Sequence, residues 1–155
     1  MEEDFLQMIR QHQAVIHKVC RLYRDTREDR EDLFQEIVYQ LWKAFPAFEG
    51  RAKLSSWMYR IALNTALASF RKRAPDITYP VALPERVTDP PAGDLQQEQL
   101  FAALKQLNDS DKAIIALYLE DMSYQEIAAI IGIDENYVGV KLNRIKTKIK
   151  NILKL

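Results

Sequence analysis

The chain has 155 residues, 48% of them hydrophobic and 28% charged, and this globular composition provides ample core material for one domain or two small ones. No apolar run approaches the length that spans a bilayer, the N-terminal residues MEEDFLQMIRQ are not a signal peptide, and the single cysteine, Cys20, excludes an internal disulfide framework. These features predict a protein of the reducing cytoplasm.

The formal net charge is zero, but the charges are unevenly distributed along the chain. Residues 136–155 contain six basic side chains and no acidic one, whereas residues 76–135 contain twelve acidic side chains and three basic ones. Binding to nucleic acid depends on the local field and not on the total charge. The zero net charge therefore does not exclude a nucleic-acid partner.

Two helices are predicted in the first third of the chain. Apolar residues recur at helical spacing from about Glu3 to Arg24. The polar run DTREDRED follows, in which Asp29 can cap a second helix that continues to Pro46. The apolar residues of this second helix cover more than one face: Leu33, Phe34, Ile37, Val38, Leu41, Trp42 and Phe45. Such a helix either lies in the middle of a bundle or offers a surface to a partner.

His17 and Cys20 lie three residues apart on the first predicted helix and could form half of a metal site. The sequence has no further cluster of ligands to complete such a site, so both side chains are interpreted as packed or solvated. We accordingly predict neither a metal nor another cofactor.

A third helix is predicted after the loop PAFEGRAK, with Ser55 or Ser56 as its N-cap. It has a polar stripe of Arg60, Asn64 and Arg71, and it ends in the basic cluster Arg71-Lys72-Arg73. A basic cluster at this end stabilises a helix through its dipole. Aromatic rings beside cations also suit single-stranded nucleic acid, because bases stack on rings and cations follow the backbone. These residues alone leave both interpretations open.

Residues 75–94 are predicted to form an extended linker, because they contain five of the six prolines and show no apolar periodicity. The helical pattern resumes from Leu95 to Leu107. Another helix is predicted from Lys112 to Leu119, after the turn and cap NDSD. The chain is therefore predicted to have two domains.

The last two predicted helices form a helix-turn-helix. Ser123 and Glu126 have the spacing of a capping box, Gly132 provides the turn, and Asp134 caps the following helix. That second helix has the basic residues of 136–155, as expected of a helix whose first residues meet base edges while later cations hold phosphates. The alternative is a solvated amphipathic helix whose lysines keep the protein soluble.

Taken together, these segments resemble a compact bacterial sigma factor of the extracytoplasmic-function (ECF) type. The segment DLFQEIVYQLWKAF resembles the part of that family that docks on the clamp helices of RNA polymerase. The segment FEGRAKLSSWMYRIALNTALASFRKR resembles the part that melts and reads the downstream promoter element. The segment LNDSDKAIIALYLEDMSYQEIAAIIGIDENYVGVKLNRIKTKI resembles the domain that reads the upstream element. A helix-turn-helix alone occurs in many regulators, so the order of these segments across the linker is the specific signal.

The resemblance implies an all-α protein with two small helical domains, the first a region 2-like bundle of residues 1–74. A linker of residues 75–94 joins it to a region 4-like helix-turn-helix domain of residues 95–155. The implied protein is not an enzyme. It binds core RNA polymerase, recognises promoter DNA, opens the duplex and captures the non-template strand. The implied partners are core polymerase, promoter DNA and an anti-sigma factor, with no small-molecule substrate.

Residue types within the matching segments predict three sets of contacts. The predicted polymerase contacts are Leu33, Gln35, Glu36 and Trp42. The predicted contacts to the downstream single strand are Lys53, Ser55, Arg60, Asn64, Arg71 and Lys72. The predicted contacts to the upstream duplex are Asn136, Tyr137, Lys141, Arg144, Lys146 and Lys148. For Trp42 and Trp57 a place in the core is equally compatible with the sequence.

Three positions depart from the family pattern: Ala68 replaces a frequent acidic residue, Asn108 a proline, and Gly139 a commonly basic residue. These departures concern the details of promoter contacts. Two other functions are compatible with parts of the sequence. A stand-alone helix-turn-helix regulator, with the first half as a dimerisation or sensor domain, would leave the basic segment around the third helix unexplained. An adaptor or anti-sigma decoy that does not bind DNA would leave the charge of residues 136–155 unexplained.

Overall fold

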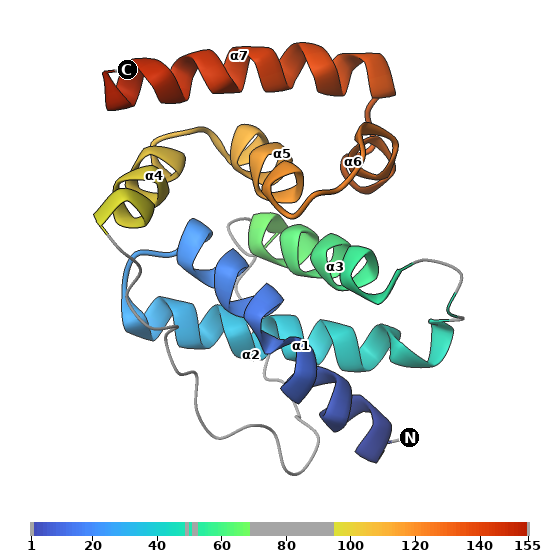
Figure 1. The fold of residues 1–155 in the computed structure, drawn as a ribbon. Coiled ribbons are helices and arrows are strands. Elements are labelled where there is room, and N and C mark those ends of the chain that lie inside the picture. Colours follow the sequence, from blue (N-terminus) through green and yellow to red (C-terminus); the bar gives the residue numbers. More distant parts are fainter. Residues whose placement is uncertain (1, 49, 51–52, 69–94, 155) are drawn as a thin grey trace. The chain divides into compact units, whose positions relative to one another are not determined.

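The computed structural model describes residues 2–48, 50, 53–68 and 95–154. In this part of the chain every regular element is a helix, which confirms the predicted all-α class (Figure 1). The chain divides into two compact units, with three α-helices before residue 69 and four after residue 94. The predicted linker, residues 75–94, lies outside the described residues. None of the described helices combines the length and the apolarity that crossing a membrane requires.

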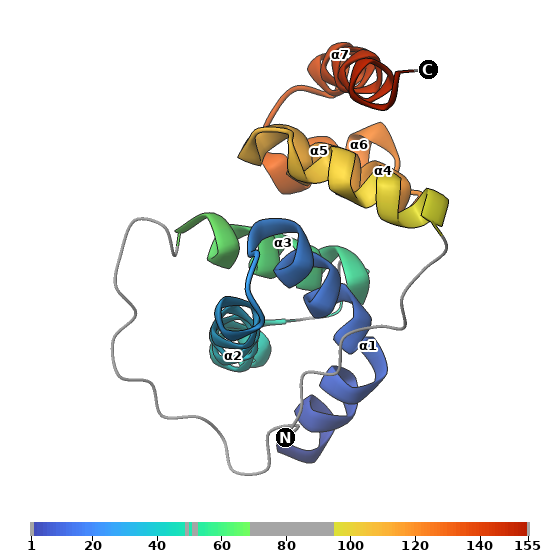
Figure 2. The same cartoon turned by 90° about the vertical axis from the view of Figure 1, so that its left-hand side faces the viewer.

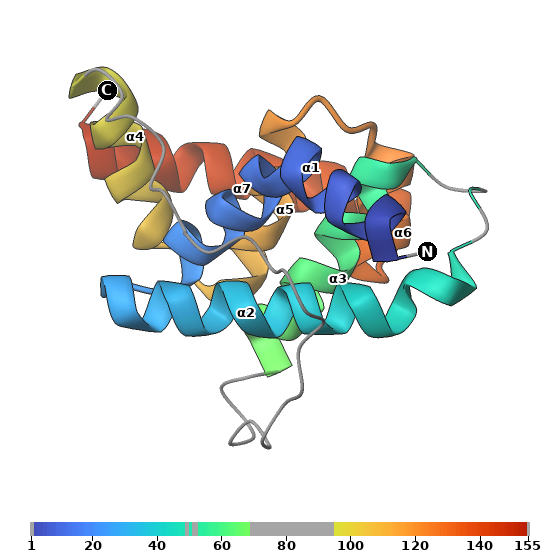
Figure 3. The same cartoon turned by 90° about the horizontal axis from the view of Figure 1, so that it is seen from below.

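The first unit is a bundle of α1 (Glu2–Tyr23), α2 (Arg27–Ala44) and α3 (Leu54–Ala68), with a short 3₁₀ helix, η1 (Phe45–Ala47), directly after α2. Each of the three α-helices packs against the other two (Figure 3). The following side chains of this bundle are at most 2% exposed: Phe5, Ile9, Ile16, Leu33, Ile37, Leu41, Met58 and Tyr59. Each buried side chain of this size contributes roughly 1.5–3 kcal/mol. All three helices supply residues to this core, so the bundle is held together by mutual packing.

Two helix starts in this unit differ from the sequence predictions. The N-cap of α2 is Thr26, whose hydroxyl oxygen accepts a hydrogen bond of 3.1 Å from the backbone N–H of Asp29. Asp29 itself lies in the first turn, where its negative charge is favourable to the helix dipole. Helix α3 already begins at Leu54, so Ser55 lies within the first turn and is not the cap. Packing accounts for this start, because Met58 and Tyr59 are buried from the second turn onward.

The second unit consists of α4 (Leu95–Lys105), α5 (Asp109–Leu119), α6 (Tyr124–Ile131) and α7 (Glu135–Leu153). Helix α7 runs across the other three and contacts each of them (Figures 1 and 2). Its residues Val138, Leu142 and Ile145 are at most 1% exposed, and Ile114 of α5 and Ile127 of α6, helices that α7 contacts, are fully buried. The second unit therefore depends on α7 for much of its core.

The helix-turn-helix is formed by α6 and α7, as predicted. The capping box is present: the Glu126 backbone N–H donates to the Ser123 hydroxyl oxygen at 3.1 Å, and the Glu126 carboxylate accepts from the Ser123 N–H at 3.4 Å. Gly132 ends α6 with φ 85° and ψ 35°, in the left-handed region that favours glycine. Asp134 is the N-cap of α7, and its carbonyl oxygen accepts the first helical bond from Val138 at 3.1 Å. The turn is thus defined by local bonds at each of its ends.

His17 and Cys20, the two residues weighed as half of a metal site, are both buried inside the first unit. The His17 ring stacks on Phe34, with ring centroids 4.9 Å apart and an angle of 26° between the planes. Burial raises the pKa of the Cys20 thiol to about 12, although the nearby charges of Arg24 and Arg30 act in the opposite direction. These placements agree with the interpretation of both residues as packed side chains.

We expect Cys20 of the native protein to react negligibly with a disulfide reagent at pH 8, because the thiolate is the reactive form and both its formation and its access are suppressed. In denaturant the same thiol should react completely, with one equivalent per chain. The absorbance of the released thiolate measures both rates. Rapid reaction in native buffer would show that the first unit opens around Cys20.

Candidate nucleic-acid interface

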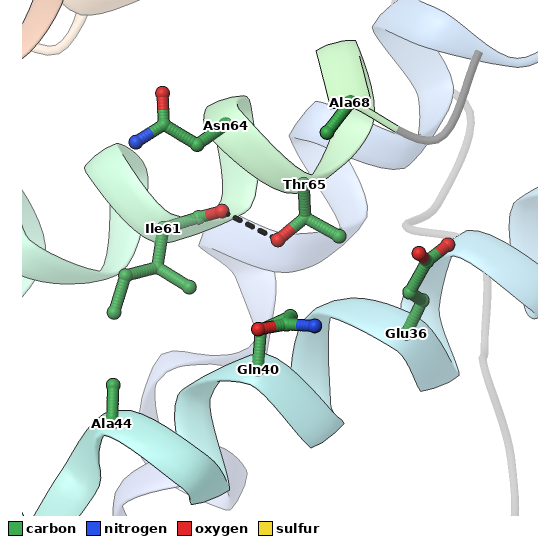
Figure 4. Close-up of a pocket in the computed structure, with 7 residues that line it drawn as sticks. All are labelled: Glu36, Gln40, Ala44, Ile61, Asn64, Thr65 and Ala68. Atoms are coloured by element: carbon green, nitrogen blue, oxygen red, sulfur yellow. Dashed lines mark hydrogen bonds between the residues drawn. The ribbon is translucent and has the colours of Figure 1, made fainter. Parts of the chain in front are cut away.

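A groove of about 360 Å³ lies between α2 and α3 in the first unit (Figure 4). It is lined by Glu36, Gln40, Ala44, Ile61, Asn64, Thr65 and Ala68. The hydroxyl of Thr65 donates to the carbonyl oxygen of Ile61 at 2.7 Å, so this group is satisfied within α3. Asn64 is exposed at the rim, and its amide points away from Gln40 of α2 (Figure 4). The groove thus brings together one predicted polymerase contact, Glu36, and one predicted single-strand contact, Asn64.

The four predicted polymerase contacts occupy different environments on α2. Leu33 is 1% exposed and packs in the core, so its side chain leaves no surface for a partner. Gln35 is exposed, and Glu36 is half-buried with a pKa raised by burial and partly lowered again by the charge of Arg24. Trp42 is half-buried and packs edge-on against Phe5, with ring centroids 5.0 Å apart. Of the four predicted contacts, Gln35, Glu36 and part of Trp42 are therefore available at the surface of α2.

Three of the predicted single-strand contacts follow one stripe on α3. Lys53 precedes the helix, Arg60 lies two turns further on, Asn64 follows after one more turn, and all three are exposed. Ser55, in the first turn, is half-buried. Arg71 and Lys72 lie outside the described residues. The described part of the predicted set thus presents two cations and one amide along a single face.

The same stripe of α3 includes Trp57, for which the sequence left a contact and a place in the core equally open. Trp57 is half-buried, and its ring lies against Phe48 with centroids 4.6 Å apart and against Phe45 at 6.5 Å. Two aromatic rings therefore support it from behind while part of its surface is open. A partly exposed ring between cations is a stacking platform for an unpaired base. The sequence signal for it was the aromatic residue at helical spacing from Lys53 and Arg60.

Three of the predicted contacts on α7 are bonded within the second unit. Lys141 donates to one carboxylate oxygen of Asp111 at 3.3 Å, and Lys148 donates to the other at 2.8 Å. Lys146 donates to the Tyr118 hydroxyl oxygen at 3.2 Å and lies 4.5 Å from the centroid of that ring. All three bonds join α7 to α5. These lysines therefore position α7, and only their remaining exposed surface is available to DNA.

Asp111 is 1% exposed, and its carboxylate is paired with Lys141 and Lys148. Burial alone would raise the pKa of its carboxyl group. The hydrogen bonds and charges of Lys148 and Lys141 outweigh burial, and the pKa of Asp111 lies below its ordinary value. Asp111 was not among the predicted site residues, because no pattern in the sequence pairs it with lysines 30 and 37 positions away.

The remaining predicted contacts, Asn136, Tyr137 and Arg144, are exposed on the face of α7 opposite its buried residues. Val140 lies between Tyr137 and Arg144 on this face and is 45% exposed. The Lys141 ammonium lies 5.8 Å from the centroid of the Tyr137 ring, a cation–π distance. The exposed face of α7 is therefore mostly uncharged in its first two turns and basic from Arg144 onward.

Comparisons with known proteins find a sigma-factor family in each of the two units. The Sigma-70 region 2 family matches residues 8–75, and the Sigma-70, region 4 family matches residues 97–149. The chain is 26% identical over 153 residues to the ECF RNA polymerase sigma factor SigM of Mycobacterium tuberculosis, covering 96% of this chain and 76% of that protein. It is 30% identical over 142 residues to the ECF RNA polymerase sigma-E factor of Haemophilus influenzae, covering 81% of this chain and 75% of that protein.

Two solved structures share the fold at 21% sequence identity. One is the sigma factor RpoE in a co-crystal structure with the anti-sigma factor NepR from Bartonella quintana, with a TM-score of 0.75 over 99% of this chain and 98% of that one. The other is CnrH in complex with the cytosolic domain of CnrY, with a TM-score of 0.71 over 99% of this chain and 90% of that one.

Proposed function

This chain belongs to the ECF type of RNA polymerase sigma factors, and we propose that it binds core polymerase through its first unit and promoter DNA through both units. The observation that supports this most is the match of a region 2 family and a region 4 family in this order along one chain. The two units offer the corresponding chemistry, with an aromatic and cationic stripe on α3 and a partly basic face on α7.

The polymerase surface in this proposal is the outward side of α2 around Gln35, Glu36 and Trp42. The burial of Leu33 fixes the rotation of α2 and thereby turns Gln35 outward. Trp42 adds an aromatic surface that is already supported by Phe5, so little side-chain freedom is lost on binding.

We expect the double substitution Gln35→Ala and Glu36→Gln to weaken binding to core polymerase by roughly tenfold or more, while the free energy of unfolding changes by only about 0.5 kcal/mol. Fluorescence anisotropy with core polymerase measures the first quantity and urea unfolding the second. Gln7→Ala, at an exposed position on α1, is the matched control and should leave both unchanged. A large loss of stability in the double variant would instead assign these residues to the fold.

Strand capture in this proposal uses the stripe on α3. Lys53 and Arg60 attract the phosphates of the opened strand, and Trp57 provides a ring on which a base can stack. The amide of Asn64 has both donors and an acceptor, so it can pair with the edge of an unpaired base. Arg71 and Lys72, which lie outside the described residues, remain predicted contacts to the single strand.

The upstream duplex in this proposal meets the exposed face of α7. The first turns of the second helix of a helix-turn-helix approach the base edges, and later residues hold phosphates. Asn136 and Tyr137 lie in the first turns, where they can meet base edges, and Arg144 lies further along, where it can hold a phosphate. The side chains of Lys141, Lys146 and Lys148 instead bond α7 to α5. One of the two solved structures holds its sigma factor together with an anti-sigma factor, and we extend a partner of this class to the present chain.

Selection of transcribed sequences from a random promoter library by core polymerase plus this protein tests the proposal as a whole. We expect enrichment of two sequence elements at a fixed spacing, absent when core polymerase acts alone. A library without enrichment would overturn the proposal. Tight binding of the free protein to one duplex sequence, together with a stable dimer, would instead support a stand-alone regulator.

A further inference from the structure

The helix-turn-helix exposes an unusual amount of apolar surface for a helix that faces DNA. Among the described residues, the exposed large apolar side chains are Leu95, Leu119, Tyr124, Tyr137 and Val140. Three of the five lie on α6 or α7, with exposed fractions of 39% for Tyr124, 43% for Tyr137 and 45% for Val140. Apolar side chains that gather at one place on a folded surface mark a binding site.

Tyr137 and Val140 lie on the face of α7 that is turned away from the core. Val138 and Leu142 are fully buried, whereas Tyr137, Val140 and Arg144 follow one another at helical spacing on the opposite side. The apolar residues thus occupy the turns of α7 that approach base edges in a helix-turn-helix. They continue directly into Arg144, which favours DNA over a protein as the occupant of this surface.

The first turns of α7 have little positive charge to place at a base edge. Gly139 provides no side chain, and a Cβ at that position would lie 3.4 Å from a ring carbon of Tyr124, so the Tyr124 ring covers this flank. On the other flank, Lys141 is 23% exposed and bonded to Asp111. Bidentate contacts to guanine use Arg or Lys, whereas apolar groups contact the methyl group of thymine.

We propose that α7 reads A·T pairs in the upstream promoter element through contact of Val140 and Tyr137 with thymine 5-methyl groups. This inference rests on the proposed function and adds the base preference to it. Asn136 and Asn143, both exposed on the same face, provide the amides that pair with adenine in the major groove. The surface therefore combines methyl contacts with amide contacts, the chemistry that distinguishes A·T from G·C pairs.

The test replaces each thymine of the selected upstream element by deoxyuridine, which lacks only the 5-methyl group. The polymerase holoenzyme containing this protein is bound to promoter DNA whose downstream part is already melted, so that upstream contacts dominate the measured affinity. We expect one or two substitutions to weaken binding by about three- to fivefold each, as loss of one buried methyl group implies. In holoenzyme with Val140→Ser, the difference between thymine and deoxyuridine should disappear at the position that Val140 contacts and remain at a position that Tyr137 contacts, whereas Val140→Ile should keep both differences.

Arg144→Ala is the control variant, because loss of a phosphate contact should weaken binding to thymine and deoxyuridine promoters by the same factor. Equal binding of both promoters by the unaltered protein, or persistence of every thymine–deoxyuridine difference in Val140→Ser, would overturn the inference. So would unchanged promoter affinity of Val140→Ser combined with weaker binding of an anti-sigma protein, because the patch would then dock a protein. All these outcomes leave selective transcription intact, whereas failure of the proposed function would abolish it.

Discussion

Replacing Asp111 by asparagine is expected to lower the stability of the second unit by roughly 2 kcal/mol, a typical value for hydrogen bonds to charged groups. The same change should raise the affinity of the protein for duplex DNA of any sequence. The neutral amide of Asp111→Asn cannot balance two ammonium groups, so the bonds of 3.3 Å and 2.8 Å to Lys141 and Lys148 are lost or weakened. The lysines are 23% and 53% exposed and return to solvent easily, which keeps the cost below that of a fully buried pair.

The gain in DNA affinity is expected because Asp111→Asn releases the ammonium groups of Lys141 and Lys148. Once released from Asp111, Lys141 and Lys148 can each neutralise a phosphate. Each additional phosphate contact steepens the dependence of log affinity on log salt by about 0.9. We therefore expect the slope measured with duplex DNA between low and physiological salt to increase by roughly one to two in Asp111→Asn.

Asp109→Asn is the matched control, because it removes a charge from the same first turn of α5 without touching the bonds to Lys141 and Lys148. Lys141→Met combined with Lys148→Met should cost at least as much stability, because the buried carboxylate of Asp111 loses both counter-charges, and should bring no gain in affinity. If Asp109→Asn and Asp111→Asn steepen the salt dependence equally, the lysines are not released and the interpretation is wrong.

The interaction of Asp111 with Lys141 and Lys148 also predicts how the stability of the second unit depends on pH. The pKa of Asp111 is lowered in the folded protein, so its contribution to stability is complete above the ordinary aspartate value of about 3.9. That contribution is lost as the pH falls through the lowered folded pKa, when the carboxylate becomes protonated. Stability of the unaltered protein should therefore decline more steeply below about pH 4 than that of Asp111→Asn, as measured by urea unfolding at a series of pH values.

Removing the amide in Asn64→Ala should reduce the formation of open promoter complexes by roughly ten- to a hundredfold, the range expected for loss of a specific base contact. Asn64 is exposed at the rim of the groove in Figure 4, so the fold should be unaffected. A template with a pre-melted bubble should not fully restore complex formation, because the lost contact is to the base itself. Permanganate footprinting measures the opened region on both templates. Asn151→Ala, at an exposed asparagine of α7, is the control and should behave as the unaltered protein.

Arg60→Ala separates phosphate attraction from base capture on the same stripe, because Arg60 lies one helical turn from Asn64. Loss of a phosphate contact should flatten the salt dependence of open-complex formation by about 0.7, the value for single strands. Asn64→Ala should leave that slope unchanged. Equal effects of the two variants on both templates would contradict separate roles for these side chains.

The parts of the fold that sequence reasoning found were those determined by neighbouring residues. The capping box at Ser123 and the left-handed cap at Gly132 each depend on side chains and dihedral angles within a few positions. Asn108 likewise accepts a bond from the backbone of Asp111, as the predicted turn NDSD required. Local chemistry of this kind is visible in the sequence because the interacting groups are close along the chain.

The parts that sequence reasoning missed depend on contacts between distant segments. The start of α3 at Leu54 follows from packing in a bundle and not from the serines next to it. Leu33 was predicted as a polymerase contact, but it is 1% exposed in a bundle where α2 packs against both α1 and α3. The basic residues of α7 looked uniformly available to DNA, yet Lys141 and Lys148 meet an acid on another helix. Periodicity shows which side of a helix is apolar, but it does not show which charge lies opposite a lysine.

The dependence of the second unit on α7 has a consequence for how the protein is made. A ribosome synthesises α7 after α4, α5 and α6, yet Val138, Leu142 and Ile145 of α7 complete the core on which those helices rest. At 5–20 residues per second, the 19 residues of α7 take about one to four seconds to appear, and during this interval the preceding helices have no finished core. The first unit has a core of its own residues and can fold before α7 is made. A nascent chain therefore has a folded first unit, including the α3 stripe proposed for the single strand, before the α7 face proposed for the upstream duplex rests on a finished core.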